Sequence, residues 1–376
     1  MPVRRPPGQP HILMTADALG GVWQYTLELA EALGRRGLTV TVALMGPAPS
    51  PDILARAEAE CGARILPTRL PLDWTAENAA LVTDAADALA RLAREIGASL
   101  VHLHSPALAL AAFEVPVVAV CHSCVATWWA ALGTGPLPQD LAWRADLAAQ
   151  GCRAADRLLA PTRAFAQATQ AAYGLRRAPE IVPNGRRLPE PMPTDEPAAH
   201  AFTAGRLWDP AKNASALDRV AARLDSPLIA AGPVDGPNGE RFAAGHLRLL
   251  GRLDAACMAR ELERRPVFVS LARYEPFGLA VLEAAGAGCA LVLSDIPTFR
   301  ELWEGAAILV PADDAVAAAE AVRCLFADPD HRAVLGAAAR NRAGRYGTEA
   351  MADRVLAVFR DCLGEARAPA LGGAAA

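Results

Sequence analysis

Short apolar runs alternate with longer amphipathic stretches along most of the chain. The runs are rich in Val, Ile, Leu and Ala, which is typical of strands buried on both faces, and the stretches between them carry apolar residues at helical spacing. Strands that alternate with helices in this way predict parallel, doubly wound sheets of the α/β class. The predicted strands are 11–15, 39–44, 64–67, 100–103, 117–120, 157–160, 180–182, 201–204, 228–231, 247–250, 267–271, 290–293 and 307–310.

A polar, proline-rich segment separates the two halves of this pattern. Four prolines lie among charged residues between positions 189 and 197, just after the tripeptide 183–185, a composition that is typical of a semi-rigid linker. The predicted domains are therefore residues 1–188 and residues 189–347. The rest of the chain, residues 348–376, is predicted to form a final helix and then a disordered tail rich in Ala and Gly.

Composition excludes several classes of protein. Hydrophobic residues make up 53% of the chain, so its body is not disordered, and a net charge of −4 with scattered basic residues gives no field that would recruit nucleic acid. The N-terminus lacks the apolar segment of a signal peptide, and the longest apolar stretch is broken by Glu114 and Pro116. We therefore expect a cytoplasmic protein.

The cysteines show no regular framework. Eight are spread over the whole chain, which favours free thiols in a reducing compartment. Cys121 and Cys124 have the spacing of a C-x-x-C motif, but no second pair completes a tetrahedral zinc site. A redox role for this pair is the weaker alternative, because its flanking residues do not fit a thioredoxin-like motif.

The segment from 267 to 287 carries the strongest functional signal. A β-branched run ends in Glu275-Pro276-Phe277-Gly278, which leads directly into an amphipathic helix. The free N–H groups of a helix start and its partial positive charge bind anions such as phosphate. Glu283 lies within the helix among apolar neighbours, where an unpaired carboxylate is costly unless something binds it. The alternative is that both glutamates belong to a solvated helix face.

The second domain also presents two cations in one loop. Lys212 is the only lysine in the chain, and it follows Gly205-Arg206 in a segment that leads from the strand 201–204 towards a helix predicted to begin near Lys212 or Asn213. An ammonium is a compact charge and a standard phosphate ligand. Arg206 and Lys212 would supply two positive charges to a diphosphate if this loop lies beside the helix after Gly278. A pair of surface cations is the structural alternative.

Three features mark the carboxyl ends of strands in the first domain. Gly20 and Gly21 follow the first strand, where they allow a ligand to approach the backbone closely or simply form a tight turn. They do not complete the G-x-G-x-x-G fingerprint of dinucleotide-binding proteins. His122 follows the strand 117–120, and His104 ends the strand before it; each is either a ligand-binding residue or a satisfied polar side chain.

Two adjacent tryptophans, Trp128 and Trp129, follow His122 in the sequence. Their rings could stack on a sugar in an acceptor site, or they could belong to the core.

The pattern Glu-Pro-Phe-Gly-Leu-x3-Glu-Ala at 275–284 resembles the Glu-x7-Glu motif of the retaining glycosyltransferases of family 4. That family has the GT-B fold, in which two Rossmann-like domains face each other across a cleft and a C-terminal helix commonly crosses back to the first domain. The resemblance implies that Glu275 contacts the transferred sugar and that Glu283 holds the ribose of the nucleotide. It also extends to the Pro-Asn-Gly tripeptide at the domain boundary.

Further residues match the family position by position. The resemblance places the donor phosphates on Arg206 and Lys212 and on the glycine-rich loop, brings the histidine after the fifth strand to the donor sugar, and sets the loop 251–253 against the base. The predicted catalytic residues are His122, Glu275, Arg206 and Lys212, and the predicted donor-binding residues are Gly20, Gly21, Arg206, Lys212, Arg252, Leu253, Glu275, Phe277, Gly278, Leu279 and Glu283.

The predicted reaction is retaining transfer of a hexose from a UDP-sugar or GDP-sugar to an unidentified acceptor, which could be a glycan, a lipid or a small molecule. No cofactor and no metal are expected, because cations and helix starts can stabilise the departing diphosphate, and Asp328-Pro329-Asp330 is interpreted as a helix cap. A lipid-linked acceptor would add peripheral contact with the inner membrane face, and the oligomeric state stays open.

Four alternatives were weighed against this prediction. They are a sugar-nucleotide epimerase of the same fold, a phosphorylase, a catalytically silent sugar-nucleotide-binding subunit and a Rossmann oxidoreductase. The missing glycine fingerprint argues against the last of these, and the presence of both glutamates and both cations argues against the silent subunit.

Overall fold

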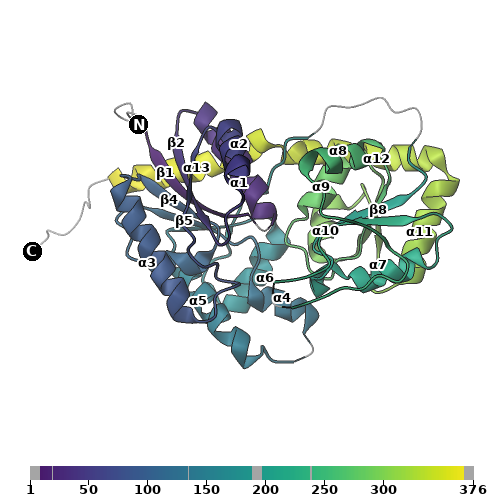
Figure 1. The fold of residues 1–376 in the computed structure, drawn as a ribbon, viewed down its shortest axis with the longest axis horizontal. Helices are drawn as coiled ribbons and strands as arrows, with labels where there is room; N and C mark the ends of the chain where they lie inside the picture. Colours follow the sequence, from purple (N-terminus) through teal and green to yellow (C-terminus); the bar gives the residue numbers. More distant parts are fainter. Residues whose placement is uncertain (1–8, 19, 134, 189–196, 238, 368–376) are drawn as a thin grey trace, which may run out of the picture.

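The computed structural model describes residues 9–18, 20–133, 135–188, 197–237 and 239–367. They form two α/β domains that lie side by side, each built on one parallel sheet (Figure 1). The first sheet has seven strands in the order β3-β2-β1-β4-β5-β6-β7, and the second has six in the order β10-β9-β8-β11-β12-β13. The predicted pair of doubly wound sheets is confirmed. Most of the predicted linker, residues 189–196, and the predicted tail after 367 lie outside the described residues.

The strands of the first sheet begin and end close to their predicted bounds. They are β1 (His11–Asp17), β2 (Thr39–Met45), β3 (Arg64–Pro67), β4 (Leu100–Leu103), β5 (Val117–Val120), β6 (Arg157–Ala160) and β7 (Glu180–Ile181). The helical elements of this domain are α1 (Gly21–Arg35), α2 (Pro51–Cys61), α3 (Ala79–Glu95), η1 (Pro106–Leu110), α4 (Val125–Leu132), α5 (Gln139–Ala154) and α6 (Arg163–Tyr173). Because helices cover both faces of the sheet, Ile12, Leu13 and Met14 of β1 are all fully buried.

The second domain repeats the same architecture. Its strands are β8 (Ala201–Ala204), β9 (Leu228–Ala231), β10 (Arg248–Gly251), β11 (Val267–Ser270), β12 (Leu291–Ser294) and β13 (Ile308–Val310). Its helical elements are η2 (Pro210–Lys212), α7 (Ala214–Ala221), α8 (Ala255–Glu263), α9 (Leu279–Gly286), α10 (Pro297–Trp303), α11 (Ala315–Ala327), α12 (Pro329–Ala343) and η3 (Gly344–Tyr346). The helix predicted to begin near Lys212 or Asn213 begins at Ala214, with a 3-10 turn before it and Asn213, left-handed at φ 55°, as its N-cap.

The last helix, α13 (Thr348–Arg367), packs on the first domain rather than on the second. Met351, Val355 and Phe359 are buried in the same apolar cluster as β1 and α1, and Figure 1 shows the helix running alongside the first sheet. No helix among the described residues has both the length and the apolar composition that a membrane span requires.

Each sheet has a point where the order of strands reverses. In the first sheet, β1 lies between β2 and β4; in the second, β8 lies between β9 and β11. The crevice beyond the carboxyl ends of the strands at such a point is the usual ligand site of open α/β sheets. The fold thus offers two such crevices, one in each domain.

Direct contacts join the domains next to these crevices. The Glu301 carboxylate on α10 accepts hydrogen bonds from the backbone N–H groups of Arg163 (2.8 Å) and Ala164 (2.7 Å), at the start of α6 in the first domain. The Tyr274 hydroxyl, which follows β11, lies 2.9 Å from Thr127 Oγ1 on α4. The carboxyl end of β11 is thereby held against the first domain.

Candidate functional site

A cavity of about 580 Å³ lies between the two domains. Its first-domain wall consists of residues at or after the carboxyl ends of β1, β2, β4 and β5, together with parts of α4 and α5, and its second-domain wall is formed by Arg206, Trp208, Asp209, Glu240 and Tyr274. The volume falls within the range of small-molecule sites, roughly 300–1,000 Å³. The predicted cleft between facing domains is therefore present, at the strand ends where the topology favours a ligand.

Lys212 and Glu275 form an ion pair in the second domain. Lys212 Nζ lies 2.5 Å from Glu275 Oε2, and both side chains are largely buried. The 3-10 turn that ends at Lys212 is fixed by Asp209, whose carboxylate accepts the Ala211 N–H at 2.9 Å. The lone lysine and the first glutamate of the motif, 63 positions apart in sequence, are thus brought together as the sequence predicts.

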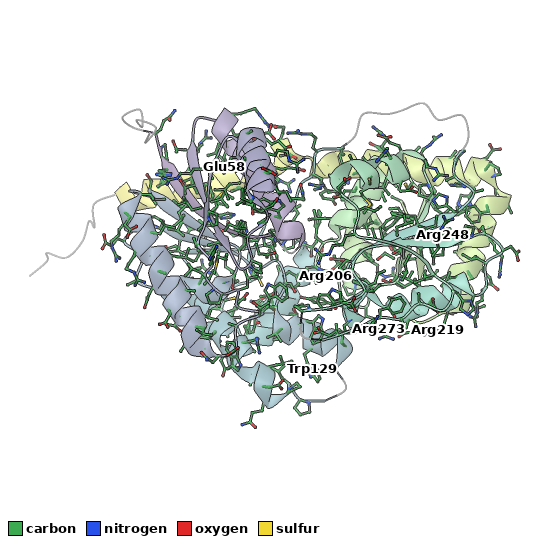
Figure 2. The ribbon with its side chains drawn as sticks, in the orientation of Figure 1. Glu58, Trp129, Arg206, Arg219, Arg248 and Arg273 are labelled. Atoms are coloured by element: carbon green, nitrogen blue, oxygen red, sulfur yellow. The ribbon has the colours of Figure 1, made fainter. Side chains whose placement is uncertain are left out.

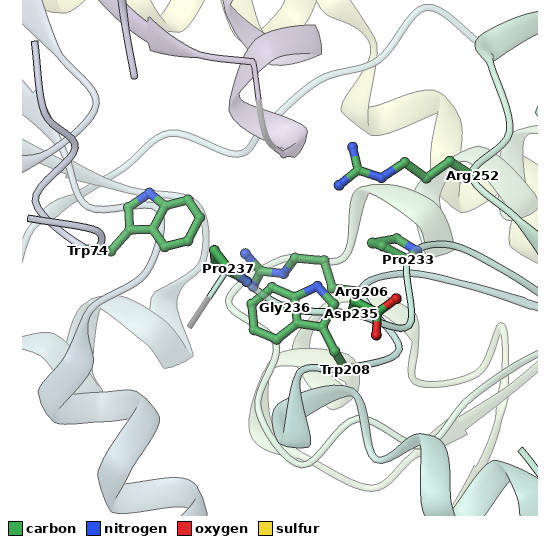
Figure 3. A pocket seen from close by; sticks show the side chains of 8 residues that line it. All are labelled: Trp74, Arg206, Trp208, Pro233, Asp235, Gly236, Pro237 and Arg252. Carbon is green, nitrogen blue, oxygen red and sulfur yellow. The ribbon is translucent and has the colours of Figure 1, made fainter. Parts of the chain in front are cut away.

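Arg206 lies at the junction of the two domains. Its Nη2 donates to Asp209 Oδ2 (2.8 Å), and its guanidinium lies 5.4 Å from the centre of the Trp208 ring. It lines the large cavity and also a smaller one of about 190 Å³, to which Arg252 contributes as well. Figure 3 shows Trp74 of the first domain on one side of this smaller cavity and the two arginines on the other.

The starts of α1 and α9 meet across the domain boundary. A Cβ atom added to Gly21 would lie only 2.9 Å from Leu279 Cδ1, so this close approach favours a glycine at position 21. Gly278 immediately before α9 has φ 94°, a left-handed conformation that glycine adopts without strain. The N-terminal ends of two helices therefore lie next to each other, an arrangement that suits an anion because helix starts carry free N–H groups.

Glu283 is not the unpaired carboxylate that its apolar neighbours suggest. Arg186 donates from Nε to Glu283 Oε1 (2.8 Å) and also pairs with Glu28 on α1. The guanidinium therefore bridges α9 of the second domain to α1 of the first. Glu28 also accepts the Thr348 hydroxyl (2.7 Å) at the start of α13. The expected need for a partner is therefore met by Arg186, and the contact of Glu283 with a ribose stays a prediction.

Two predicted donor-binding side chains belong to the core of the second domain. Phe277 is 3% exposed, and its ring packs edge-on against Tyr346 with centroids 5.7 Å apart. Leu253 is partly buried against the same apolar cluster. Because both side chains are apolar and packed, only their backbone groups can reach a ligand. Gly20, in contrast, has open space around its Cα and lines the large cavity.

His122 and His104 form a hydrogen-bonded pair in the wall of the large cavity. His104 Nδ1 lies 3.0 Å from His122 Nε2, and the buried Tyr25 ring packs edge-on against both imidazoles. Burial lowers the pKa of His122 to about 4, and burial together with the neighbouring histidines lowers the pKa of His104 well below its ordinary value. Both rings are therefore neutral at pH 7, so that each can donate one hydrogen bond and accept another.

The two adjacent tryptophans have different surroundings. Trp128 lines the large cavity, whereas the Trp129 indole N–H donates to the Gly135 carbonyl at 3.0 Å. Sequence reasoning missed Trp74, Trp143 and Trp208, which also line the large cavity. Their only sequence signal is that each lies in or after the connection that follows a predicted strand.

Among the described residues, no three His, Cys, Asp or Glu side chains are placed to hold a metal ion. Asp328 accepts the His331 N–H at 2.9 Å and caps α12, as the sequence predicts. The metal-independent reaction stays a prediction. All eight cysteines are free thiols, which confirms the expected absence of a disulfide framework.

Two family models match the chain, one in each domain. The model of Glycosyltransferase Family 4 matches residues 19–188, and the model of Glycosyl transferases group 1 matches residues 239–342. The chain belongs to glycosyltransferase family 4. Several of the predicted site residues lie within the matched segments. The first match contains Gly20, Gly21 and His122, and the second contains Arg252, Glu275 and Glu283.

Curated relatives of this family 4 glycosyltransferase are transferases with inositol-containing names. The phosphatidyl-myo-inositol mannosyltransferase of Mycolicibacterium smegmatis is 33% identical over 46% of this chain and 47% of its own length. The Mycobacterium leprae protein of the same name is 25% identical over 91% of this chain and 93% of its own. The D-inositol 3-phosphate glycosyltransferase of Kineococcus radiotolerans is 29% identical, with 92% and 91% covered.

Solved structures confirm the GT-B fold of this family 4 glycosyltransferase. The sucrose-phosphate synthase of Thermosynechococcus elongatus aligns with a TM-score of 0.77 at 19% identity, over 95% of this chain and all of that one. The Anabaena protein Alr3699/HepE, in complex with UDP-glucose, aligns with a TM-score of 0.72 at 16% identity, over 93% and 99% of the two chains.

Proposed function

We propose that this glycosyltransferase transfers a hexose from a nucleoside diphosphate sugar, UDP-linked or GDP-linked, to an acceptor hydroxyl with retention of anomeric configuration. The observation that carries the proposal is the ion pair of Lys212 with Glu275, which directly follows the cavity-lining Tyr274, together with the start of α9, which approaches the cavity-lining Gly21. Several positive groups at one point suit a diphosphate, because its negative charge rises as the glycosidic bond breaks.

The second domain would stabilise the leaving group. Lys212 supplies a compact charge, Arg206 supplies a planar fork, and the free N–H groups at the start of α9 point towards the same region. Asp209 and Glu275 hold the two cations in place before the donor binds, so that little reorganisation is needed during the reaction. Arrays of this kind can neutralise a diphosphate without a metal.

The transferred sugar would lie between Glu275 and His122. Glu275 comes from the second domain and His122 from the first, so a hexose held by both would lie in the cleft. His122 is neutral because burial lowers its pKa to about 4, and it therefore acts as a hydrogen-bonding group rather than as a cation. Its Nε2 already faces His104, which leaves Nδ1 for a ligand.

The nucleotide would bind on the side of α9 where Glu283 lies. Glu283 shares Oε1 with Arg186, and its second oxygen has no hydrogen bond among the contacts of the described residues. A ribose hydroxyl could donate to that oxygen while the ion pair persists. Arg252 lines the smaller cavity together with Arg206, which also lines the large one.

Donor binding gives the first test. A relative is named a mannosyltransferase and a structural neighbour was solved with UDP-glucose, so GDP-mannose and UDP-glucose are the first donors to compare. We expect one of them to raise the melting temperature of the protein, since a ligand that binds only the folded state stabilises it by mass action. NMR of the product then reports its anomeric configuration, and a repeat in EDTA reports metal dependence.

A matched pair of arginine variants controls this experiment. Figure 2 shows Arg206 between the domains and Arg248 on the far side of the second domain. Arg206→Ala should abolish most of the donor-induced shift, and the exposed Arg248→Ala should keep it. If no UDP-sugar or GDP-sugar shifts the melting temperature of the wild-type protein, the proposed donor class is wrong. Donor binding without transfer to any acceptor would favour the silent binding subunit.

A further inference from the structure

Four of the seven tryptophans line the large cavity, and they come from four separate segments. Trp74 lies in the connection after β3, Trp128 on α4, Trp143 on α5 and Trp208 in the loop after β8. None of the four is fully buried. Exposed indole faces gathered around one cavity form a large apolar surface, and a ligand with a flat apolar face would remove that surface from water.

The cations of this cavity are already engaged. Arg144, the only described arginine or lysine on the first-domain wall, donates to the Ala76 carbonyl (2.7 Å) and lies 4.3 Å from the centre of the Trp143 ring. Arg206, on the other wall, is paired with Asp209. The acidic lining residues outnumber these two arginines; they are Asp17, Asp73, Asp140, Asp209 and Glu240. A second phosphate on the first-domain side would therefore meet more negative than positive charge.

The same wall offers acceptors to a hydroxyl group. Asp73 accepts the Ser105 hydroxyl at Oδ2 (2.7 Å) and the Trp74 backbone N–H at Oδ1 (2.9 Å). Each carboxylate oxygen can accept a further hydrogen bond. Asp73 and Ser105 both line the cavity next to Trp74, so polar groups stand directly beside an apolar ring.

We propose that this cavity binds an uncharged ring alcohol as the acceptor, a molecule with one apolar face and hydroxyl groups at its rim, and not a phosphorylated polyol or a phospholipid head group. The assignment rests on the proposed function, because it takes the cavity as the acceptor side of a glycosyl transfer. The acceptor hydroxyl oxygen bonds to the anomeric carbon, the bond from that carbon to the diphosphate oxygen breaks, and the hydroxyl proton leaves with the diphosphate.

This acceptor class differs from the one that the relatives' names contain. Those names specify phosphatidyl-myo-inositol and D-inositol 3-phosphate, both of which carry phosphate. A phosphorylated acceptor brings its own negative charge beside the donor diphosphate, and a site for it needs additional cations. The first-domain wall provides aromatic faces and carboxylates at that place instead.

The test compares neutral and phosphorylated acceptors in the full-length protein. Initial rates are measured with saturating donor and with phenyl β-D-glucoside, methyl β-D-glucoside, phenol or D-inositol 3-phosphate, and binding is followed by intrinsic tryptophan fluorescence. We expect kcat/KM for phenyl glucoside to exceed that for D-inositol 3-phosphate at least tenfold. The methyl glucoside and phenol arms show whether a pyranose or an aromatic ring supplies the apolar face.

Adjacent tryptophans give a matched pair of variants. Trp128→Ala should lower kcat/KM for phenyl glucoside at least tenfold, whereas Trp129→Ala, whose indole bonds to Gly135 outside the cavity, should change it less than twofold. Trp128→Phe keeps an aromatic ring, so its kcat/KM should lie between those of Trp128→Ala and Trp129→Ala. An intermediate value would show that the loss in Trp128→Ala is not caused by misfolding.

Two results would overturn the proposal. One is a rate or fluorescence response to D-inositol 3-phosphate equal to or stronger than the response to phenyl glucoside. The other is an equal effect of the Trp128 and Trp129 substitutions. Failure of the proposed function is distinguishable, because a wild-type protein that no sugar nucleotide stabilises can still be titrated with phenyl glucoside by fluorescence.

Discussion

The two walls of the interdomain cleft differ in how they handle charge. The second domain holds its charges in ion pairs, Arg206 with Asp209 in the wall itself and Lys212 with Glu275 next to the lining residue Tyr274. On the first-domain wall, His104 and His122 are paired only with each other and kept neutral by burial, beside a set of tryptophans. If the proposed function holds, the second domain binds the anion and the first-domain wall binds the uncharged molecule.

This difference teaches how one cleft can serve two substrates. A diphosphate and a hydroxyl acceptor need opposite environments, because the first requires compensating charge and the second requires only hydrogen-bonding and apolar groups. The domains keep the environments separate, while Tyr274 and Glu301 hold the two walls together. Each prediction below removes one component of this contrast.

Replacing Lys212 should have the largest effect, because it removes the compact charge of the second wall. We expect Lys212→Ala to lower kcat about 100- to 1,000-fold, the usual loss when one preorganised donor to developing negative charge is removed. Glu275 would also lose its cation and with it a fixed orientation. Steady-state kinetics with the donor identified by thermal shift measure the loss.

Two further variants make the Lys212 result specific. Lys212→Arg keeps the charge but spreads it over a planar fork, so its rate should fall between those of the wild type and the alanine variant. Arg219→Ala removes an exposed cation from the neighbouring helix α7 and should leave the rate within twofold of wild type. Similar rates for Lys212→Ala and wild type would contradict the assignment of Lys212 to the leaving group.

Replacing Arg186 should have an intermediate effect, because this residue links helices of the two domains and does not line the cavity. Its side chain is 13% exposed, and it pairs with Glu283 of α9 and Glu28 of α1. Arg186→Gln would leave the partly buried carboxylates of Glu28 and Glu283 without the positive charge that now lies between them. We expect a loss of about 2 kcal/mol in unfolding free energy, somewhat below the cost of breaking a fully buried pair. The KM for donor should rise as Glu283 loses its fixed position.

Arg187 is the matched control, because it is adjacent in sequence and also pairs with a glutamate of α1. Its side chain is 65% exposed where it meets Glu31. Arg187→Gln should therefore change stability by less than about 0.5 kcal/mol, as for most surface ion pairs. Thermal and urea denaturation of both variants compare the two sites. Equal losses would mean that Arg186 acts only as another surface charge.

The local pattern of apolar and polar residues was enough to predict the strands of both sheets and the Glu-x7-Glu motif, because each depends on residues that are close together in the sequence. The strands Arg64–Pro67, Leu100–Leu103 and Val117–Val120 were predicted at both ends, since each is a short apolar run bounded by polar or turn residues. The approach of Lys212 to Glu275 followed from placing both at carboxyl ends of strands in one sheet.

Contacts between the domains could not be predicted in the same way. Arg186 and Glu28 are 158 positions apart and carry no pattern that links them. Trp74 and Trp208 line the same cavity only because the two domains face each other. The hydrophobic periodicity of the sequence does not predict how the domains are placed. The apolar neighbours of Glu283 indicated that its carboxylate needs a partner. The partner is Arg186, which lies in the segment where the chain passes from the first domain to the second.

The neutrality of the histidines in and behind the first wall can be measured through the acid stability of the protein. His102 of β4 is fully buried behind His104, packs against Phe359 of α13, and has a pKa that burial lowers to about 3. In the unfolded chain a histidine gains its proton near pH 6.5. Between these two values the unfolded state binds the extra proton, so stability must fall as the pH is lowered from about 6.5 towards 3.

His102→Phe should remove this contribution, which is negligible at pH 7 and grows only as the pH is lowered. Between these pH values, each buried neutral histidine lowers the free energy of unfolding by roughly 1.4 kcal/mol per pH unit as the pH falls. The free energy of unfolding of the variant should therefore fall less steeply with pH, by about that amount per unit. A phenylalanine also fills the space against Phe359 without the two ring nitrogens that have no partner. Urea denaturation at several pH values from 4 to 7 measures the slope, with the exposed His246→Asn as control. A wild-type protein whose stability does not change between pH 6.5 and 4.5 would contradict the neutral state of His102 in the folded protein.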